Sequence, residues 1–384
     1  MSRHADRLLR PAQAALPPGR LGRPDDGAAA DRGAAPVGHE VTVAAALRSR
    51  DGAGDPVRQA RLRDLGGRLA ALFVRHSARV PAARPDLWFT YHLYYKAPDW
   101  LGPRVADALA IPYVVAEASV AGKRSGGAWR LGHDAVVAAL GRADAVIGLN
   151  SADRDAVLPA LAAPERYHAM RPFIATAPFA AAIGGRAAAR EALASRHGLD
   201  AAVPWLVAVA MMRAGDKLAS YRLLAAALTR SRDLPWRLLL VGDGPARDDV
   251  AAAFAPRGGR VAWLGRIEGP ALAATLAACD LMTWPAVNEA YGMALLEAQA
   301  AGLPVLAGAS GGVADIVVNG VTGGLVPAGD AVAFAGALAE LLAFPARLRA
   351  LGDAAAARAA AAHDIAGAAR RLDGILRGVA GARS

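Results

Sequence analysis

Cysteine is almost absent from this 384-residue chain, because Cys279 is the only one. No disulfide can therefore form within the chain, which separates it from the disulfide-stabilised secreted domains. Cys279 lies in the apolar stretch LAACDLM, so we expect it to be a small core residue. The missing disulfide favours a cytoplasmic protein, with the inner face of the membrane as a second location that we keep open.

Long apolar runs are also missing. No stretch of about 18 apolar residues occurs, so the sequence predicts no membrane-spanning helix. The first twenty residues, MSRHADRLLRPAQAALPPGR, are interrupted by charges, so we expect no secretory signal there. Aromatic residues make up only 5% of the chain, and no basic block alternates with stacking aromatics. We therefore expect no nucleic acid as a partner.

The composition that remains is that of a globular α/β protein. Hydrophobic residues make up 54% of the chain, and 384 residues exceed one ordinary core, so we expect two domains. The formal net charge is +10, with arginine dominating. This charge indicates either a solvated basic surface or a surface that attracts phosphate-bearing partners such as nucleotides and anionic lipid headgroups.

The first 36 residues show neither the period of a strand nor that of a helix. They are rich in arginine, proline, glycine, alanine and aspartate. We interpret residues 1–36 as an irregular segment, either disordered or translated from a wrong start or frame. The first strand of the following domain, with its glycine-rich turn, is therefore expected to be missing.

From residue 37 onward, short apolar strands alternate with helices, which is typical of parallel βαβ units. We predict an N-terminal Rossmann-like domain over 37–171 and a C-terminal one over 172–362. A last helix over 363–384 is expected to cross back to the N-terminal domain. Expected strands lie within 38–47, 86–100, 111–127, 143–150, 204–212, 236–241, 261–265, 280–285, 303–308 and 323–328.

Ligands of open parallel sheets bind at the carboxyl ends of the strands, and the second half carries polar residues at several such ends. Arg213 and Lys217 follow one strand and precede a helix, an arrangement that suits a diphosphate or, alternatively, an exposed basic loop. Gly242 and Gly244 follow the next strand. Because Arg247 stands where a third glycine would complete a dinucleotide fingerprint, a tight strand-to-helix turn explains them better than an NAD site.

Two carboxylates eight positions apart stand in the stretch NEAYGMALLEAQAAGLPV. Glu289 precedes a helix whose first N–H groups, near Tyr291, Gly292 and Met293, can hold a phosphate. Glu297 lies further along this helix among apolar neighbours, where we expect it to need a hydroxyl-bearing ligand as partner. The alternatives are a dipole-stabilising acid for Glu289 and a solvated helix position for Glu297.

Together these motifs resemble the retaining glycosyltransferases of family 4, which have the GT-B fold of two Rossmann-like parallel-sheet domains facing a central cleft. The resemblance covers about residues 203–342, through the Arg/Lys pair, VGDGP, NEAYGMALLE, AGLPVLAG and GGVADIVVNGVTGGLVP. It implies that Arg213 and Lys217 contact the donor diphosphate. It also implies that Glu289, Tyr291, Gly292 and Met293 hold the sugar and phosphate, that Glu297 holds the ribose, and that Gly242, Gly244, Arg266 and Ile267 complete the nucleotide site.

The first half resembles the family more loosely. His92 and Glu117 stand at strand ends where the family places acceptor-side residues, although many members carry a histidine in place of Glu117. Lys123 and Arg124 either reach a phosphate across the cleft or form a solvated loop. The Arg213–Lys217 spacing is one residue shorter than in typical members.

The resemblance implies transfer of a sugar from a nucleotide diphosphate sugar to an acceptor hydroxyl, with retention and without a metal or other cofactor. The alternatives are a nucleotide-sugar-binding pseudoenzyme with a defective acceptor domain and a GT-B sugar-nucleotide epimerase; an NAD oxidoreductase is the most remote. The acceptor stays open between a glycan, a lipid-linked sugar and a small molecule, and the basic charge would allow peripheral membrane association.

Overall fold

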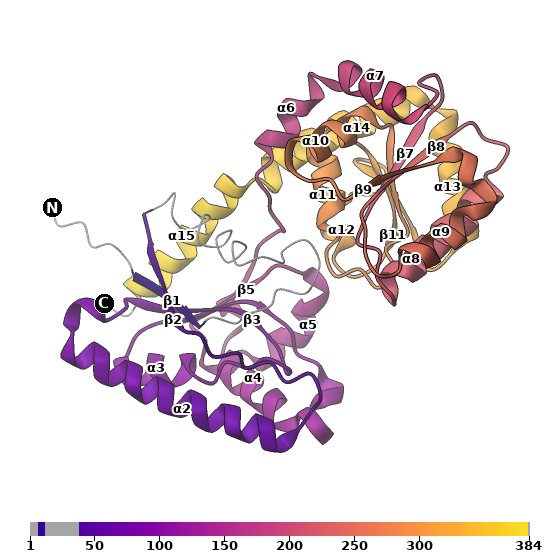
Figure 1. Cartoon of the computed structure of the whole chain (residues 1–384). Coiled ribbons are helices and arrows are strands. Elements are labelled where there is room, and N and C mark those ends of the chain that lie inside the picture. The colour runs from indigo at the N-terminus through magenta and orange to yellow at the C-terminus, as the bar shows by residue number, and fades with distance from the viewer. Residues whose placement is uncertain (1–6, 12–37, 383–384) are drawn as a thin grey trace. The chain divides into compact units, whose positions relative to one another are not determined.

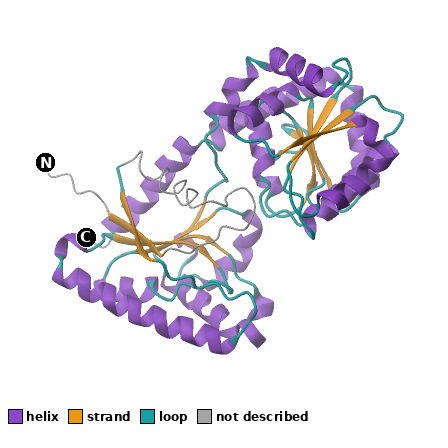
Figure 2. Cartoon of the chain, viewed as in Figure 1, coloured by secondary structure: helices purple, strands orange, loops and turns teal. Residues whose placement is uncertain are grey.

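The computed structural model describes residues 7–11 and 38–382, and the chain divides into two compact units (Figure 1). The first unit comprises Met1–Met170 together with Ala366–Ser384, and the second comprises Arg171–Ile365. In each unit helices lie on both faces of one six-stranded sheet (Figure 2). Every strand pairing in both sheets is parallel, as the alternation of strands and helices predicted.

The sheet of the first unit has the order β2-β1-β3-β4-β5-β6. Its strands are β1 (Arg7–Pro11), β2 (Glu40–Ala45), β3 (Leu87–Leu93), β4 (Tyr113–Ala118), β5 (Ala145–Gly148) and β6 (Tyr167–Ala169). The expectation that no strand precedes residue 37 is wrong, because Arg7–Pro11 pairs with β2 on one side and β3 on the other. Five residues are too few to display a period. The remainder of residues 1–36 lies outside the described residues.

Two long helices frame this unit. The first, α2 (Pro56–Arg79), begins at Asp55, whose carboxylate accepts hydrogen bonds from the first two free N–H groups of the helix. The last helix of the chain, α15 (Ile365–Gly381), returns to this unit, where Asp373 contacts the buried His39 at 2.8 Å. The other helices are α3 (Gly102–Leu109), α4 (Arg130–Arg142) and α5 (Arg154–Val157).

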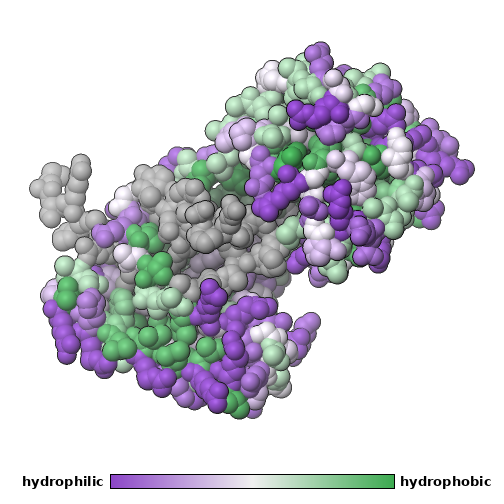
Figure 3. Space-filling model, in the orientation of Figure 1, coloured by the Kyte–Doolittle hydropathy of each residue, from purple (hydrophilic) through white to green (hydrophobic). Residues whose placement is uncertain are grey.

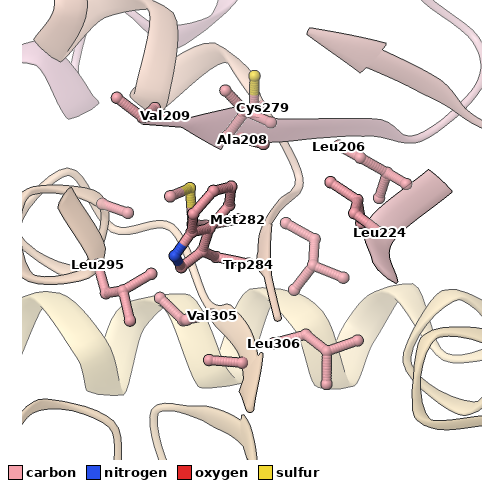
Figure 4. Packing of buried hydrophobic residues seen from close by; sticks show 14 of the residues in the cluster. Leu206, Ala208, Val209, Leu224, Cys279, Met282, Trp284, Leu295, Val305 and Leu306 are labelled. Atoms are coloured by element: carbon pink, nitrogen blue, oxygen red, sulfur yellow. The ribbon is translucent and has the colours of Figure 1, made fainter. Parts of the chain in front are cut away.

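The sheet of the second unit has the order β12-β11-β10-β7-β8-β9, which is the doubly wound arrangement with its reversal between β7 and β10. Its strands are β7 (Trp205–Val209), β8 (Arg237–Val241), β9 (Val261–Gly265), β10 (Leu281–Trp284), β11 (Val305–Ala309) and β12 (Gly323–Pro327). Side chains of β7, β10 and β11 interlock in the core shown in Figure 4, with Leu224 and Leu295 added from two helices. Cys279 is fully buried there, as predicted.

The helices of the second unit form two layers around this sheet. One layer holds α8 (Asp216–Arg230), α9 (Arg247–Phe254) and α13 (Ala331–Ala343), whereas the other holds α6 (Ala177–Ile183), α7 (Arg186–His197), α10 (Gly269–Ala278), α11 (Met293–Ala300) and α14 (Pro345–Ala362). A short helix, α12 (Val313–Ile316), follows β11. The reversal at β7 and β10 leaves the ends of both strands open to a ligand, because the connections leave in opposite directions.

On the visible face, apolar residues gather in a band on the first unit with hydrophilic residues along its margin, whereas both kinds are mixed on the second unit (Figure 3). Within residues 7–11 and 38–382, no single helix is long and apolar enough to cross a membrane. Helices α13 and α14 reach the length and apolar composition of a membrane span only when they are taken together, and the chain bends by 101° between them.

The turn after β8 lies against the chain that leaves β7. Gly242 has a φ of 140°, and a Cβ atom added to it would collide with the carbonyl oxygen of Ala210. The backbone N–H of Ala210 in turn donates to the carbonyl oxygen of Val241 at 3.1 Å. The absent side chain at Gly242 therefore lets two loops of the carboxyl edge pack backbone to backbone.

We predict that Gly242→Ala lowers the free energy of unfolding by about 2 kcal/mol or more, because it adds both a steric collision and an unfavourable φ. Urea denaturation of the purified protein measures this change. Gly259→Ala is the matched control, since nothing lies within 4 Å of its added Cβ atom. A Gly242→Ala variant as stable as the Gly259→Ala variant would contradict this account of the turn.

Candidate functional site

The loops that follow the strands of the second sheet all leave from one edge, because the strands are parallel. The predicted donor-site residues of this unit lie in these loops or in the helices that begin there. Residues 213–217 follow β7, residues 242–244 follow β8, residues 266–267 follow β9, and residues 289–297 follow β10. The topology alone therefore gathers residues that are up to 84 positions apart in the sequence.

The centre of this edge is an ion pair across the reversal between β7 and β10. Lys217, in the first turn of α8, directs its Nζ to Oε2 of Glu289, which lies in the loop after β10. Both side chains are largely buried, with 19% and 13% of their surfaces exposed. A charge-assisted hydrogen bond at such a depth is screened little by solvent, so it holds the two loops together.

Trp284, the last residue of β10, places the Glu289 carboxylate. Its indole Nε1 donates to the same Oε2 at 3.0 Å, and Nζ of Lys217 lies 5.4 Å from its ring centroid. The ring is packed edge-on against Tyr221 of α8, whose hydroxyl donates to the carbonyl oxygen of Ala210 at 2.8 Å. Sequence analysis treated Trp284 only as a strand residue, although a tryptophan at a strand end carries a polar N–H suited to such a role.

The loop between Trp284 and Glu289 has an unusual backbone. Ala286 and Asn288 have φ values of 55° and 49°, in the left-handed region that residues other than glycine rarely adopt. Side chains from two neighbouring segments hold it, because the N–H of Val287 donates to Ser220 Oγ and that of Glu289 to Ser310 Oγ. Backbone strain that the surroundings maintain is common at functional sites, which supports a ligand-binding role for Glu289.

Arg213, in the loop between β7 and α8, is the second cation predicted to contact the diphosphate. It is half-buried, and its carbonyl oxygen accepts from the N–H of Leu218 to close the turn before α8. Within the described part of the chain, its guanidinium has no carboxylate within salt-bridge distance. Lys217 is neutralised by Glu289, whereas Arg213 keeps its charge available for an anion.

Gly242 and Gly244, which follow β8, allow the backbone of the loop after β7 to pack closely against the turn. Gly244 repeats the arrangement of Gly242, because an added Cβ atom would collide with the carbonyl oxygen of Met212. The loop of residues 210–213 thus rests directly on the turn, and the N–H of Met212 donates to the carbonyl oxygen of Asp243 at 2.9 Å. Contact of these glycines with a ligand stays a prediction.

The residues after β9 lie two strands away from the ion pair. Arg266 is exposed and forms a salt bridge of 2.7 Å with Glu268, so it is not an unpaired cation. Ile267 is partly buried and packs against the core of the second unit. These positions border the same edge, which is where a base was expected from the resemblance.

The helix α11 begins after Gly292, whose φ is 76°. Met293 and Tyr291 are half-buried at this start, near Glu289 in the chain. Glu297 is half-buried on the same helix and already has an interaction partner within the protein. The contact of Glu297 with hydroxyl groups of a ligand stays a prediction.

His92 and Glu117 come together at the carboxyl edge of the first sheet. They lie near the ends of the adjacent strands β3 and β4, and Nδ1 of His92 is 3.3 Å from Oε1 of Glu117. Nδ1 of His92 makes no hydrogen bond, so this is a charge contact that exists when the imidazole is protonated. Both residues have positive φ values, 64° and 57°, which again marks a strained backbone.

Asp153 joins this pair, and sequence analysis missed it. Burial raises the pKa of its carboxyl, the charge of Glu117 raises it further, and a hydrogen bond from Ser119 and the nearby His92 act in the opposite direction. Asp153 follows β5, the strand beside β4, so its position at the shared edge of the sheet was the signal that could have found it.

The sequence of the chain is similar to glycosyltransferases. A sequence model of the family described as glycosyl transferases group 1 matches residues 203–343. A D-inositol 3-phosphate glycosyltransferase of Kribbella flavida is 30% identical over 305 residues, which cover 74% of this chain and 70% of that protein. The enzyme of the same name from Rhodococcus erythropolis is 36% identical over 172 residues, and this match spans only 38% of its length.

Solved structures resemble nearly the whole chain. A glycosyltransferase from Rickettsia africae superposes with a TM-score of 0.76 at 14% identity, covering 98% of each chain. Anabaena HepE, solved in complex with UDP and glucose, gives a TM-score of 0.69 at 18% identity over 97% of this chain and 100% of its own. This likeness confirms the predicted GT-B fold. By its sequence and by its two parallel α/β units, the chain belongs to the group 1 family of glycosyl transferases.

Proposed function

We propose that the protein transfers a glycosyl group from a nucleoside diphosphate sugar to an acceptor hydroxyl, with retention at the anomeric carbon. The observation that carries the proposal is the contact of Lys217 with Glu289 at the strand reversal of the second unit. Arg213, which has no carboxylate partner among the described residues, stands four positions before Lys217 in the loop that leads into α8. A diphosphate needs cations, and a sugar needs a hydrogen-bond acceptor next to them. This edge offers both within one cluster.

The two cations act on the leaving group. Negative charge grows on the diphosphate oxygen as its bond to the anomeric carbon breaks, and fixed cations stabilise this charge more than that of the bound donor. Arg213 brings a charge that no described carboxylate neutralises. Lys217 is held by Glu289 until a diphosphate competes for it, and the carboxylate can then accept hydroxyl hydrogens of the sugar.

Retention follows if the leaving group and the acceptor share one face of the sugar. The acceptor oxygen bonds to the anomeric carbon, the bond from that carbon to the diphosphate oxygen breaks, and the hydroxyl proton passes to the departing diphosphate. The products are a glycoside and a nucleoside diphosphate, and the balance needs no protein nucleophile. Charge stabilisation and positioning are then the tasks of the protein.

Uridine nucleotides are the first donors to test, since HepE has been solved with UDP-glucose. The relatives named D-inositol 3-phosphate glycosyltransferases make a phosphorylated polyol the first acceptor to test. The cluster of His92, Glu117 and Asp153 in the first unit can accept and orient hydroxyl groups, so we assign it to the acceptor side of the reaction.

We predict that Arg213→Ala and Lys217→Ala each reduce kcat/KM for the donor by about 2–4 kcal/mol in transition-state free energy, or roughly 30- to 1000-fold. UDP should also shift the melting temperature of these variants less than that of the wild type. Arg222→Ala is the matched control, because Arg222 lies on the same helix α8 with 61% of its side chain exposed. Equal activity of the Arg213, Lys217 and Arg222 variants would refute the donor site.

We also predict that the product keeps the anomeric configuration of the donor sugar. The coupling constant of the anomeric proton, measured by NMR directly after the reaction, distinguishes retention from inversion. A free sugar without a glycoside in every acceptor assay would favour hydrolysis or epimerisation instead, and donor binding without turnover would favour a pseudoenzyme.

Asp153 yields a pH-dependent prediction. Because its pKa is raised in the folded protein, the ionised carboxylate destabilises the fold at neutral pH. Asp153→Asn should therefore raise the free energy of unfolding at pH 7. This gain should shrink as the pH falls through the raised pKa, and it should vanish below the ordinary aspartate pKa of about 3.9.

Urea denaturation at several pH values tests this linkage. Asp155→Asn serves as the control, since 93% of the Asp155 side chain is exposed and its replacement should leave stability nearly unchanged. An Asp153→Asn variant that is less stable than the wild type at pH 7 would mean that the contacts of Asp153 outweigh its burial.

A further inference from the structure

Two cations of the first unit rest on one pair of aromatic rings. Tyr95 follows β3, Trp129 precedes α4, and their rings meet edge to face with centroids 5.8 Å apart. The Nζ of Lys96 lies 5.7 Å from the Tyr95 centroid and 5.3 Å from that of Trp129. The guanidinium carbon of Arg124 lies 5.5 Å and 4.9 Å from the same two centroids. Both positive charges are thereby brought to one place.

Buried polar residues fix the loops that carry this cluster. The N–H of Asp51 donates to the carbonyl oxygen of Lys96 at 2.7 Å, and the indole of Trp129 donates to the carbonyl oxygen of Asp51 at 3.3 Å. The amide of Gln59 donates both to the Asp51 carboxylate and to the carbonyl oxygen of Ala128. Asp51 and Gln59 are only 3% and 4% exposed, so the cluster has a rigid base.

The charges of the cluster are not balanced within residues 7–11 and 38–382. No carboxylate of this part of the chain lies within salt-bridge distance of Lys96 or Arg124. The carboxylate of Asp51 accepts the N–H groups of Ala53 and Asp55 and the amide of Gln59. The Nε of Arg124 is buried without a hydrogen-bond acceptor. Contacts with aromatic faces are weak at exposed sites and provide no oxygen for these donors.

An aromatic row connects this cluster with the acidic cluster of the same unit. The ring of Tyr94 lies 4.8 Å from that of His92 on one side and 6.0 Å from that of Tyr95 on the other. The edge of the sheet therefore has an acidic end at Glu117 and a cationic end at Lys96. A ligand whose hydroxyl lies at the first end and whose anionic group lies at the second would match both charges.

We propose that Lys96 and Arg124, held on Tyr95 and Trp129, form a binding site for an anionic group carried by the acceptor, a phosphate monoester or a carboxylate on a sugar or polyol. This assignment rests on the proposed glycosyl transfer for the word acceptor, whereas the anion site itself does not. The planar guanidinium and the ammonium group would supply charge-assisted hydrogen bonds to the oxygens, and the rings would pack against the ligand. Lys123, the neighbour of Arg124, is exposed and takes no part.

Isothermal titration of the full chain tests the site with inorganic phosphate, glucose 6-phosphate, glucuronate and glucose as probes, in saturating UDP to occupy the donor site. We expect glucose 6-phosphate or glucuronate to bind the wild type. Lys96→Gln and Arg124→Gln should weaken this binding about tenfold each, and Lys123→Gln, the matched control, less than twofold. Thermal unfolding of each variant verifies that it folds, which we expect because removing one of two neighbouring cations relieves repulsion.

The probes separate the sources of the anion. Binding of glucose 6-phosphate and inorganic phosphate without glucuronate identifies a phosphate site, and the reverse identifies a carboxylate site. Unchanged affinity in both Lys96→Gln and Arg124→Gln, equal loss in Lys123→Gln, or no binding of any anionic probe overturns the proposal. Binding only to vesicles of phosphatidylglycerol would assign the cations to a lipid surface and also overturn it.

The anion site and the proposed glycosyl transfer can fail independently of each other. UDP binding and hydrolysis of the donor by water depend on the second unit and should be unchanged in Lys96→Gln and Arg124→Gln. If no acceptor is ever glycosylated but anion binding depends on both cations, the transfer proposal fails and the anion site stands. If transfer to neutral acceptors proceeds at equal rates in these variants and no anion binds, the transfer proposal stands and the anion site fails.

Discussion

The contact between Lys217 and Glu289 is the interaction on which the second unit's site depends. It joins a helix that follows β7 to a loop that follows β10, across the point where the direction of the sheet connections reverses. Each partner lowers the cost of burying the other, because a buried charge without a counter-charge destabilises the fold. Trp284, Ser220 and Ser310 keep the two partners in place, and the packed glycine turn after β8 supports the loop that carries the second cation.

Charged side chains are paired differently at the carboxyl edges of the two sheets. In the second unit, a cation and an acid neutralise each other, and in the proposed function they exchange partners when a diphosphate and a hydroxyl-bearing sugar bind. In the first unit, acidic and cationic groups are kept apart by a row of aromatic rings. The +10 net charge of the sequence says little about this arrangement, because the local pairing of charges and not their sum decides what binds.

Sequence periodicity was sufficient for ten of the twelve described strands. It failed at Arg7–Pro11 and at Tyr167–Ala169, because strands of five and three residues are too short to display a period. Residues at strand ends, such as Glu289 and His92, could be predicted because parallel topology brings strand ends together. Trp284, Asp153 and the Tyr95–Trp129 pair could not, since their roles arise from contacts between loops that no spacing encodes.

The burial of Cys279 has a practical consequence for following motion in this protein. The thiol is inaccessible and burial raises its pKa, so we expect it to react little with maleimides. The natural chain therefore offers no competing thiol, and a cysteine introduced at exposed Lys123 and another at exposed Arg266 would be the only groups to take up dyes. Energy transfer between such dyes, one in each unit, would test whether added UDP changes the distance between them.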